Sequence, residues 1–404
     1  MNIAFLSTFS PTNNIGGVEN HIRFISSEFG KMGHSVTIFV PTHVIESNTQ
    51  DLIHENVQII HINIKYAKIV RLLENHMDLP KIGFLFSFLK KLSFNLSAKQ
   101  ISSHIKKSKI DILHQHDFTS SMGASKLAAR HGIPCILTNH TGEYLYFQKS
   151  WFGRFLLRHL LSHYKFIIGP STELTPRLPD INSVTIYNGV SPDLFYKWEK
   201  RRISASRQNF GFTDQDFLIL CPRRWAPTKG VIFLIKSIIE NKYPSHFKFL
   251  FAGSDYNGFP AYVHEIENLI SNAPNPSQIV KLGNCDITQM ATLYNLSNIS
   301  IIPSLMEAVS LSAVESMATG TPVISTNVGG MPELIHDNIN GLLIPPGDPV
   351  QIYKSIMKIY QLPSGEVDSM TNEGHKTAKN LSWQAIACAT LQIYRETLNK
   401  EQSS

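Results

Sequence analysis

The sequence predicts an α/β fold of two doubly wound domains, each built around a parallel sheet with helices on its faces. Short apolar runs typical of buried strands alternate with stretches of helical periodicity. This alternation of strand-like and helical stretches stops at residues 188–208, where turn residues and charges replace it, and then begins again. A chain of 404 residues with 43% hydrophobic residues is long enough for two sizeable cores.

The beginning of the chain predicts a strand, a loop, a helix and a second strand. Residues 2–8 (NIAFLST) form a strand-like run, and residues 35–41 (SVTIFVP) form the next one. Between them residues 18–32 predict a helix that ends before Gly33, and four apolar residues fall on one face of it: Val18, Ile22, Ile25 and Phe29.

Similar strand-like runs continue on both sides of the boundary. Those of the first half are residues 111–117, 134–140, 165–171 and 184–190. Those of the second half are residues 217–224, 247–254, 278–284, 299–304, 321–326 and 341–346. We therefore expect a first domain over residues 1–187, a second over 188–383, and a final helix over about 384–404 that packs back on the first.

Composition excludes several classes of protein. The start of the chain lacks the segments of a signal peptide, and no apolar run approaches the ~20 residues of a membrane helix. The spacing of the four cysteines argues against a disulfide framework and a zinc site: Cys135, Cys221, Cys285 and Cys388. We expect a cytoplasmic protein.

Positive charge is concentrated in the first half of the chain. Residues 1–200 carry 21 Lys and Arg against 14 Asp and Glu, a net +7, whereas residues 201–404 carry 16 against 17, a net −1. Ten of the cations lie within residues 61–110, which favours a negatively charged partner such as phosphate or an anionic membrane. The alternative is a solvated helix face.

Ligands of open parallel sheets bind beyond the carboxyl ends of the strands. After the first strand, Gly16 and Gly17 directly precede a helix. There the backbone can approach a ligand closely, and the helix N-terminus can bind a phosphate or carboxylate. This is not a GxGxxG motif, and a plain tight turn is the alternative.

Two cations follow the first strand of the second half. Arg224 and Lys229 lie five residues apart on a loop, and Gly230 opens the next helix. An arginine fork and a lysine point charge suit a diphosphate, since each charge-assisted contact is worth about 1.5–3 kcal/mol. Ordinary surface charge is the alternative.

The stretch from Met306 to Asp348 holds two glutamates eight residues apart. Glu307 falls in a loop, and Glu315 falls in a short helix predicted over residues 311–319. Ser312 and Glu315 also match a capping box, in which the glutamate only satisfies the helix start. Asp348 is predicted to cap the helix that follows it.

Two further patterns resemble metal sites. Asp214 and Asp216 form a DxD sequence, which we interpret as a turn because it precedes a strand in polar surroundings. His114 and His116 have the spacing of metal ligands on one face of a strand, but the sequence offers no clear third ligand, so packing or hydrogen bonding is favoured. We expect no bound metal.

The order and spacing of the motifs resemble glycosyltransferase family 4, the nucleotide-sugar enzymes of the GT-B fold, over nearly the whole chain. The motifs that carry the resemblance are GGVEN (16–20), DILHQHD (111–117), LTNH (137–140), YNGVSPDLF (187–195), PRRWAPTKG (222–230), the two glutamates with seven residues between them, GTPVISTNVGGMPELI (320–335) and NGLLIPPGD (340–348).

The resemblance implies two Rossmann-like domains that face each other across a cleft, with the nucleotide on the C-terminal domain and the acceptor mainly on the N-terminal one. It implies a retaining transfer of a hexosyl-type unit from a nucleotide-diphosphate sugar to a glycan or lipid-linked acceptor. We expect a role in cell-surface polysaccharide, lipopolysaccharide or glycolipid synthesis, with no cofactor and no nucleic acid partner.

The resemblance also implies roles for individual residues. Arg224 and Lys229 would neutralise the leaving diphosphate, and Glu315 would hold the ribose hydroxyls. Glu307 would face the donor sugar, and His140 would line the reaction centre. The glycine loop at Gly16 and Gly17 would close against the phosphate, and the helix start at Ser310 and Leu311 would add its partial positive charge to the cations.

The chain departs from the family pattern at two places. Ala308, Val309 and Ser310 replace a common Gly-Phe-Gly after the first glutamate, and Arg223 stands where a glycine is common. Two other functions share the fold: a sugar-nucleotide epimerase, which would turn over without an acceptor, and a catalytically inactive binding protein on a membrane surface.

Residues 81–109 are the candidate contact with an anionic membrane. Lysines lie between and after four apolar residues at helical spacing: Leu85, Phe88, Leu92 and Leu96. An apolar stripe with a basic flank can lie in a membrane interface and bring the first domain to a lipid-linked acceptor. A core-facing helix followed by solvated lysines is the alternative.

Overall fold

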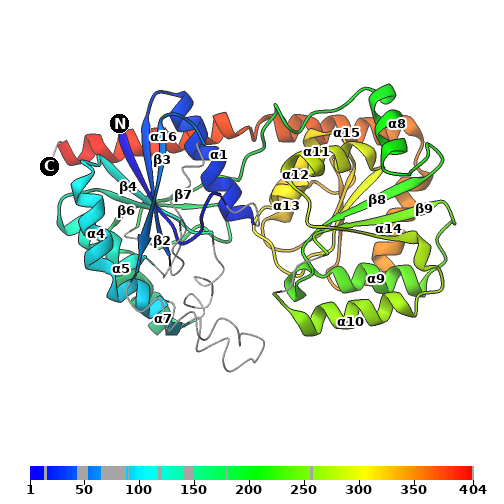
Figure 1. The fold of residues 1–404 in the computed structure, drawn as a ribbon, viewed down its shortest axis with the longest axis horizontal. Coiled ribbons are helices and arrows are strands. Elements are labelled where there is room, and N and C mark those ends of the chain that lie inside the picture. Colours follow the sequence, from blue (N-terminus) through cyan, green and yellow to red (C-terminus); the bar gives the residue numbers. More distant parts are fainter. Residues whose placement is uncertain are drawn as a thin grey trace. The chain divides into compact units, whose positions relative to one another are not determined.

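Every pair of neighbouring strands in the described part of the chain is parallel, in agreement with the predicted α/β class. The computed structural model describes residues 1–12, 16–42, 53–64, 88–89, 91–116, 121–140, 145, 147, 150–178, 181–254 and 258–402. The chain divides into two compact units (Figure 1): unit 1 comprises Met1–Tyr187 and Trp383–Ser404, and unit 2 comprises Asn188–Ser382.

Unit 1 contains a seven-stranded sheet in the order β3-β2-β1-β4-β5-β6-β7. Its strands are β1 (Asn2–Leu6), β2 (Ser35–Thr42), β3 (Val57–Asn63), β4 (Ile112–Gln115), β5 (Cys135–Thr138), β6 (Tyr164–Gly169) and β7 (Ser183–Thr185). The order reverses at β1, so the carboxyl ends of β1 and β4 lie at a topological switch point, where open α/β sheets bind ligands.

Helices cover both faces of this sheet. Helices α4 (Ala98–Lys107), α5 (Met122–Arg130) and α7 (Trp151–Leu161) bury apolar residues in one core on one face. Helices α1 (Gly17–Lys31) and α16 (Trp383–Gln402) pack against each other on the other face, where the rings of Phe29 and Tyr394 lie 5.6 Å apart. The last helix of the chain is therefore part of unit 1.

Unit 2 contains a six-stranded sheet in the order β10-β9-β8-β11-β12-β13. Its strands are β8 (Phe217–Pro222), β9 (Phe247–Ala252), β10 (Ile279–Gly283), β11 (Ile299–Ile302), β12 (Val323–Thr326) and β13 (Leu342–Ile344). The order reverses between β8 and β11, so the loops that follow these two strands meet at the switch point of unit 2.

The helices of unit 2 also lie on two faces of its sheet (Figure 1). They are α8 (Lys200–Asn209), α9 (Val231–Glu240), α10 (Pro260–Ser271), α11 (Ile287–Leu296), α12 (Leu311–Ala318), α13 (Met331–Leu334), α14 (Pro349–Gln361) and α15 (Ser364–Lys379), with short 3-10 turns at Pro227–Lys229 (η1) and Pro276–Gln278 (η2). Helices α9 and α14 pack together against the core, and α12 packs against α15.

Most helices and strands have the features that their sequences predicted, such as a buried apolar face, a glycine at the end or a capping side chain. Helix α1 buries Ile22, Ile25 and Phe29 and is followed by Gly33 in a left-handed conformation (φ 78°). The side chain of Asp348 accepts hydrogen bonds from the first turn of α14, as a cap does. Strand β3 was not predicted; it lies at the edge of the sheet, and only Val57 and Ile62 of its seven residues are buried.

Among the described helices, none is both long enough and apolar enough to cross a membrane.

A glycine controls the approach of two loops in unit 2. Gly230 has a left-handed backbone (φ 62°), and a Cβ at this position would lie 2.0 Å from the carbonyl oxygen of Pro303. We expect Gly230→Ala to lower the free energy of unfolding by about 3 kcal/mol or more, because the backbone must move as well as adopt a strained φ.

Gly211→Ala is the matched control, since Gly211 is also left-handed (φ 78°) but has no atom within 4 Å of its added Cβ. Gly211→Ala should lower the free energy of unfolding by about 1–2 kcal/mol, because it introduces the strained φ without a close contact. Urea unfolding of the full chain compares the two variants, and equal losses would contradict the close approach at Pro303.

Candidate functional site

The loops after β8 and β11 are held together at the switch point of unit 2. The loop after β8 turns through η1, and the carbonyl of Thr228 in that turn accepts hydrogen bonds from the amides of Leu305 and Met306, at 2.8 and 3.3 Å. This contact depends on Gly230, which lets the two backbones approach. The side chains that follow β8 therefore face those that follow β11.

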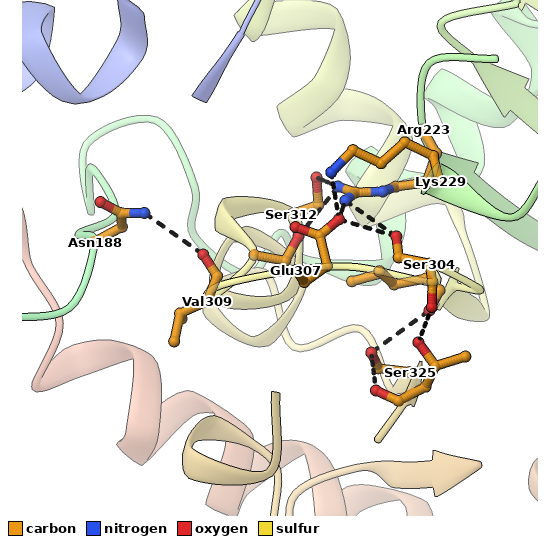
Figure 2. Close-up of polar contacts among 11 residues, drawn as sticks. Asn188, Arg223, Lys229, Ser304, Glu307, Val309, Ser312 and Ser325 are labelled. Atoms are coloured by element: carbon orange, nitrogen blue, oxygen red, sulfur yellow. Dashed lines mark hydrogen bonds and ion pairs between the residues drawn. The ribbon is translucent and has the colours of Figure 1, made fainter. Parts of the chain in front are cut away.

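The Glu307 carboxylate lies between two cations at this point (Figure 2). Its Oε1 atom accepts a hydrogen bond from Lys229 Nζ at 2.6 Å and one from Ser304 Oγ at 2.9 Å. Arg223 Nη2 forms an ion pair with the same oxygen. Such charge-assisted contacts are stronger than neutral hydrogen bonds, so they hold the Glu307 side chain in one orientation.

Arg223 is the most buried cation of the group, with 8% of its surface exposed. Its guanidinium donates to three serine hydroxyls, those of Ser310 at 3.1 Å, Ser312 at 3.4 Å and Ser304 at 3.2 Å. Burial lowers the pKa of Arg223 to about 10, so it remains charged at neutral pH. Its Nε atom is buried without a hydrogen-bond partner in the described part of the chain.

Lys229 lies beside two arginines. Burial and then the charges of Arg223 and Arg224 lower the pKa of Lys229 below its ordinary value. The Glu307 carboxylate, 2.6 Å away, favours the charged form, and an anionic ligand would favour it further. Arg224 is half-buried and lies close enough to affect this ammonium group. The arrangement suits an anion with more than one negative charge.

Helix α12 begins directly beside these cations. Its N-cap residue is Ser310, whose hydroxyl accepts from Arg223 and makes no capping hydrogen bond to the helix. The N-terminal amides at Leu311 and Ser312 therefore receive no side-chain cap, and they carry the partial positive charge of the helix. Asn188 donates to the carbonyl of Val309 at 3.5 Å and so contacts the same loop (Figure 2).

Glu315 is not part of a capping box, so that alternative is wrong. Helix α12 starts at Leu311, which places Ser312 inside the helix, and the Glu315 carboxylate instead accepts a hydrogen bond from the Tyr294 hydroxyl at 3.0 Å. Burial raises the pKa of Glu315 to about 7, although the Tyr294 hydrogen bond and the charge of Arg223 lower it. A buried acid with a raised pKa is a feature that functional sites share, so Glu315 remains a candidate for ligand binding.

The other predicted site residues lie in unit 1. Helix α1 begins after Gly16, and no side chain caps its first turn at Gly17. One turn further along α1, the ring of His21 lies 4.6 Å from that of His140, which follows β5. Burial, and then the charges of nearby histidines, lower the pKa of His140 well below its ordinary value, so its ring is neutral at physiological pH.

The structure thus groups the predicted residues by unit. It brings Lys229, Glu307 and Ser310 together around one buried arginine, and it places Glu315 on the helix that starts there. Sequence reasoning missed the role of Arg223 and of Tyr294. The signal for Arg223 was present as a departure from the family pattern, whereas Tyr294 is a distant residue on α11 that only the fold brings to Glu315.

The DxD sequence is a turn, as predicted. Asp216 accepts hydrogen bonds from the amide and hydroxyl of Thr213, at 2.7 and 2.8 Å, so its carboxylate is engaged in local structure. Burial acts to raise the pKa of Asp216, but the hydrogen bonds from Thr213 and the charges of Lys248 and Arg207 together lower it.

The chain is similar in sequence to known glycosyltransferases. Residues 203–377 match the family described as Glycosyl transferases group 1, and residues 15–194 match the one described as Glycosyltransferase Family 4. The uncharacterized glycosyltransferase MJ1178 of Methanocaldococcus jannaschii is 28% identical over 311 residues, which are 76% of this chain and 81% of the relative.

Two solved structures share the fold. Sucrose-phosphate synthase from Thermosynechococcus elongatus superposes with a TM-score of 0.80 at 18% identity, over 99% of both chains. Alr3699/HepE of Anabaena, in complex with UDP and glucose, superposes with a TM-score of 0.75 at 16% identity, over 98% of this chain and 100% of that one. At these identities the likeness shows the fold alone, which is GT-B.

The Arg223 contacts predict a large effect of one substitution on stability. Arg223→Met is expected to lower the free energy of unfolding by about 2–3 kcal/mol, because Glu307 and three serine hydroxyls lose a charged donor inside the protein. Lys229 still pairs with Glu307, which limits the loss.

Lys281→Met is the matched control, since Lys281 forms an exposed ion pair with Glu267 at 2.9 Å. Exposed pairs contribute about 0–1 kcal/mol. Urea unfolding followed by tryptophan fluorescence measures both variants. A loss at Arg223 no larger than that at Lys281 would show that the buried contacts do not stabilise unit 2.

Proposed function

Because this chain belongs to glycosyltransferase family 4, we propose that it transfers a hexosyl-type unit from a nucleotide-diphosphate sugar to a glycan or lipid-linked acceptor, with retention of anomeric configuration. The observation that carries the proposal is the group of cations beside the uncapped start of α12, at the switch point of the unit 2 sheet. Such a place binds phosphates in open α/β folds.

The proposed chemistry explains why cations are needed there. When the bond from the anomeric carbon to the diphosphate breaks, its electron pair leaves with the phosphate oxygen, and the sugar acquires oxocarbenium character. The acceptor hydroxyl then bonds to the anomeric carbon and passes its proton to an oxygen of the departing diphosphate. Arg224, Lys229 and the amides of α12 stabilise the negative charge that develops on the diphosphate, which lowers the barrier.

The remaining residues of unit 2 contact the rest of the donor in this proposal. Glu315, oriented by Tyr294, accepts hydrogen bonds from the ribose hydroxyls. The three contacts to Glu307 converge on Oε1, so Oε2 is the atom that we assign to a hydroxyl of the donor sugar. Arg223 orients Glu307 and has no other assigned role.

In unit 1 we assign His140 to the reaction centre and the loop at Gly16 and Gly17 to the phosphate. The neutral imidazole of His140 can donate or accept a hydrogen bond with a sugar hydroxyl. The UDP and glucose bound to the Anabaena neighbour support a nucleotide-sugar donor. We place the reaction in the cytoplasm, in the synthesis of cell-surface polysaccharide, lipopolysaccharide or glycolipid.

Removal of either cation tests the diphosphate assignment. We expect Lys229→Ala and Arg224→Ala each to reduce turnover by 100-fold or more, about 3 kcal/mol of transition-state stabilisation. Lys354→Ala, an exposed cation on α14, is the matched control and should leave the rate unchanged. Product formation from a labelled donor measures the rate, and circular dichroism checks folding.

A folded Lys229 or Arg224 variant with near wild-type turnover would contradict the assignment. Omitting the acceptor from the same assay separates transfer from epimerisation, because an epimerase continues to convert the donor. A protein without either activity toward any donor would favour the binding-protein alternative.

Metal independence and retention are a second prediction. Activity is expected to persist in EDTA, because fixed cations and a helix terminus occupy the role that a divalent metal has in other transferases. A proton NMR time course should show a product with the anomeric configuration of the donor. Activity that is lost in EDTA and restored only by magnesium or manganese would contradict metal independence. A product of inverted configuration would contradict retention.

The last part of the proposal is that a surface of unit 1 contacts an anionic membrane. Of the predicted segment 81–109, residues 81–87 and 90 lie outside the described residues, Leu85 among them. Phe88, Leu92 and Leu96 are exposed, so these three residues of the stripe do not face the core, whereas α4, further along the segment, buries Ile101 and Ile105.

Helix α7 offers a stronger candidate for the membrane contact. Trp151, Phe152 and Phe155 are 75%, 60% and 66% exposed, although exposed aromatic clusters are uncommon on soluble proteins. Arg154 and Arg158 are exposed on the same helix, whose opposite side buries Leu157 and Leu161. Aromatic rings at the headgroup level and adjacent cations suit an anionic bilayer.

We therefore expect the protein to float with anionic liposomes at low salt and to be released at high salt. The double variant Trp151→Glu and Phe155→Glu should bind at least tenfold less. Ile339→Glu, at a 57% exposed apolar residue of unit 2, is the control and should bind like wild type. Equal recovery of all three proteins, or no flotation, would leave a soluble acceptor as the better proposal.

A further inference from the structure

Four histidines gather beyond the carboxyl ends of β1, β4 and β5 in unit 1. His21 comes from α1, His114 and His116 from the end of β4, and His140 from the residues after β5. One ring nitrogen from each of His21, His116 and His140 lies within 4.8 Å of the others. The structure thus brings His21 and His140 to His116, which the spacing of His114 and His116 alone could not indicate.

The geometry of the closest pair matches that of two ligands on one ion. His116 Nδ1 and His140 Nε2 lie 3.3 Å apart, and their rings are stacked with centroids 5.5 Å apart. Two nitrogens bound tetrahedrally at about 2.0–2.1 Å from Zn²⁺ are themselves separated by roughly 3.3 Å. The ring of His21 completes the group, 4.6 Å from His140 and 5.5 Å from His116.

His114, the fourth histidine, is not a ligand, but it packs against one of the other three. His114 Nδ1 contacts the Tyr394 hydroxyl at 2.6 Å, and its Nε2 contacts the Thr138 hydroxyl at 2.7 Å, so both nitrogens are engaged. Its ring packs 4.2 Å from that of His116. His116 is fully buried, and its Nε2 has no hydrogen-bond partner among the described residues.

The protonation state also suits metal binding. Burial lowers the pKa of both His116 and His140 well below the ordinary value, with smaller effects from neighbouring histidines. Their rings are therefore neutral at physiological pH, which is the form that binds a metal without first losing a proton. An all-imidazole ligand set suits Zn²⁺ or a similar transition ion and does not suit Mg²⁺ or Ca²⁺.

We propose that His21, His116 and His140 form a binding site for one divalent transition-metal ion of the Zn²⁺ class, with a fourth position open to water. The site goes beyond the proposed transfer, which needs no metal. Because His140 is also assigned to the reaction centre, an ion bound here would withdraw that ring from a sugar acceptor and inhibit the transfer.

Cobalt(II) binding tests the site without reference to activity. The full chain, purified without a histidine tag and freed of metal, is titrated with Co²⁺. We expect one equivalent to produce the intense visible absorption of a four-coordinate site, and Zn²⁺ to displace it. His21→Gln and His140→Ala should each weaken Co²⁺ binding at least tenfold. The exposed His131→Ala, the matched control in unit 1, should bind like wild type.

His140 is only half-buried, so its variant keeps the test valid if substitution of the more buried His21 disturbs folding. Thermal unfolding of each variant checks this. The absence of a saturable one-equivalent transition in the wild type would overturn the proposal. Wild-type affinity in a folded His140→Ala protein would do the same, because the ion would then bind elsewhere.

Discussion

The buried Glu307 carboxylate, paired with Arg223 and Lys229, is the contact on which the candidate site of unit 2 depends. One carboxylate oxygen accepts from Lys229 at 2.6 Å and from Ser304 at 2.9 Å, and it also pairs with Arg223. These partners come from the loops after two adjacent strands, so the contact fixes both loops at once. Removing Glu307 would leave two neighbouring cations without their counter-charge inside the protein, which is costly.

Much of the fold could be predicted, because buried parallel strands are continuous apolar runs separated by helices. The runs at residues 217–224 and 299–304 correspond to β8 and β11, whose carboxyl ends meet at the switch point. The rule that ligands bind at such ends therefore directed attention to the two loops in which Lys229 and Glu307 lie. Strand β3 escaped prediction because it lies at an edge, where half-buried side chains weaken the apolar signal.

The side-chain partners could not be predicted to the same extent, because they depend on contacts distant in sequence. Local spacing made Glu315 resemble a helix cap, but the helix begins one residue before Ser312 and Tyr294 is its partner, 21 residues away. In the sequence, Arg223 could be noticed only because the family commonly has a glycine there. Its buried position depends on its contacts with the serines after β11. Likewise His21, on a helix, could not be connected by spacing with the histidines that follow β4 and β5.

Calorimetric titration of the full chain with UDP, GDP and ADP, each compared with its monophosphate, tests the central claim most directly. The account predicts that at least one diphosphate binds ten times or more tightly than its monophosphate, about 1.4 kcal/mol, because its second phosphate reaches the cations beside α12. This advantage should disappear in a folded variant that carries both Arg224→Ala and Lys229→Ala. Equal affinity for diphosphate and monophosphate with every base, or an advantage that survives in the double variant, would contradict the account.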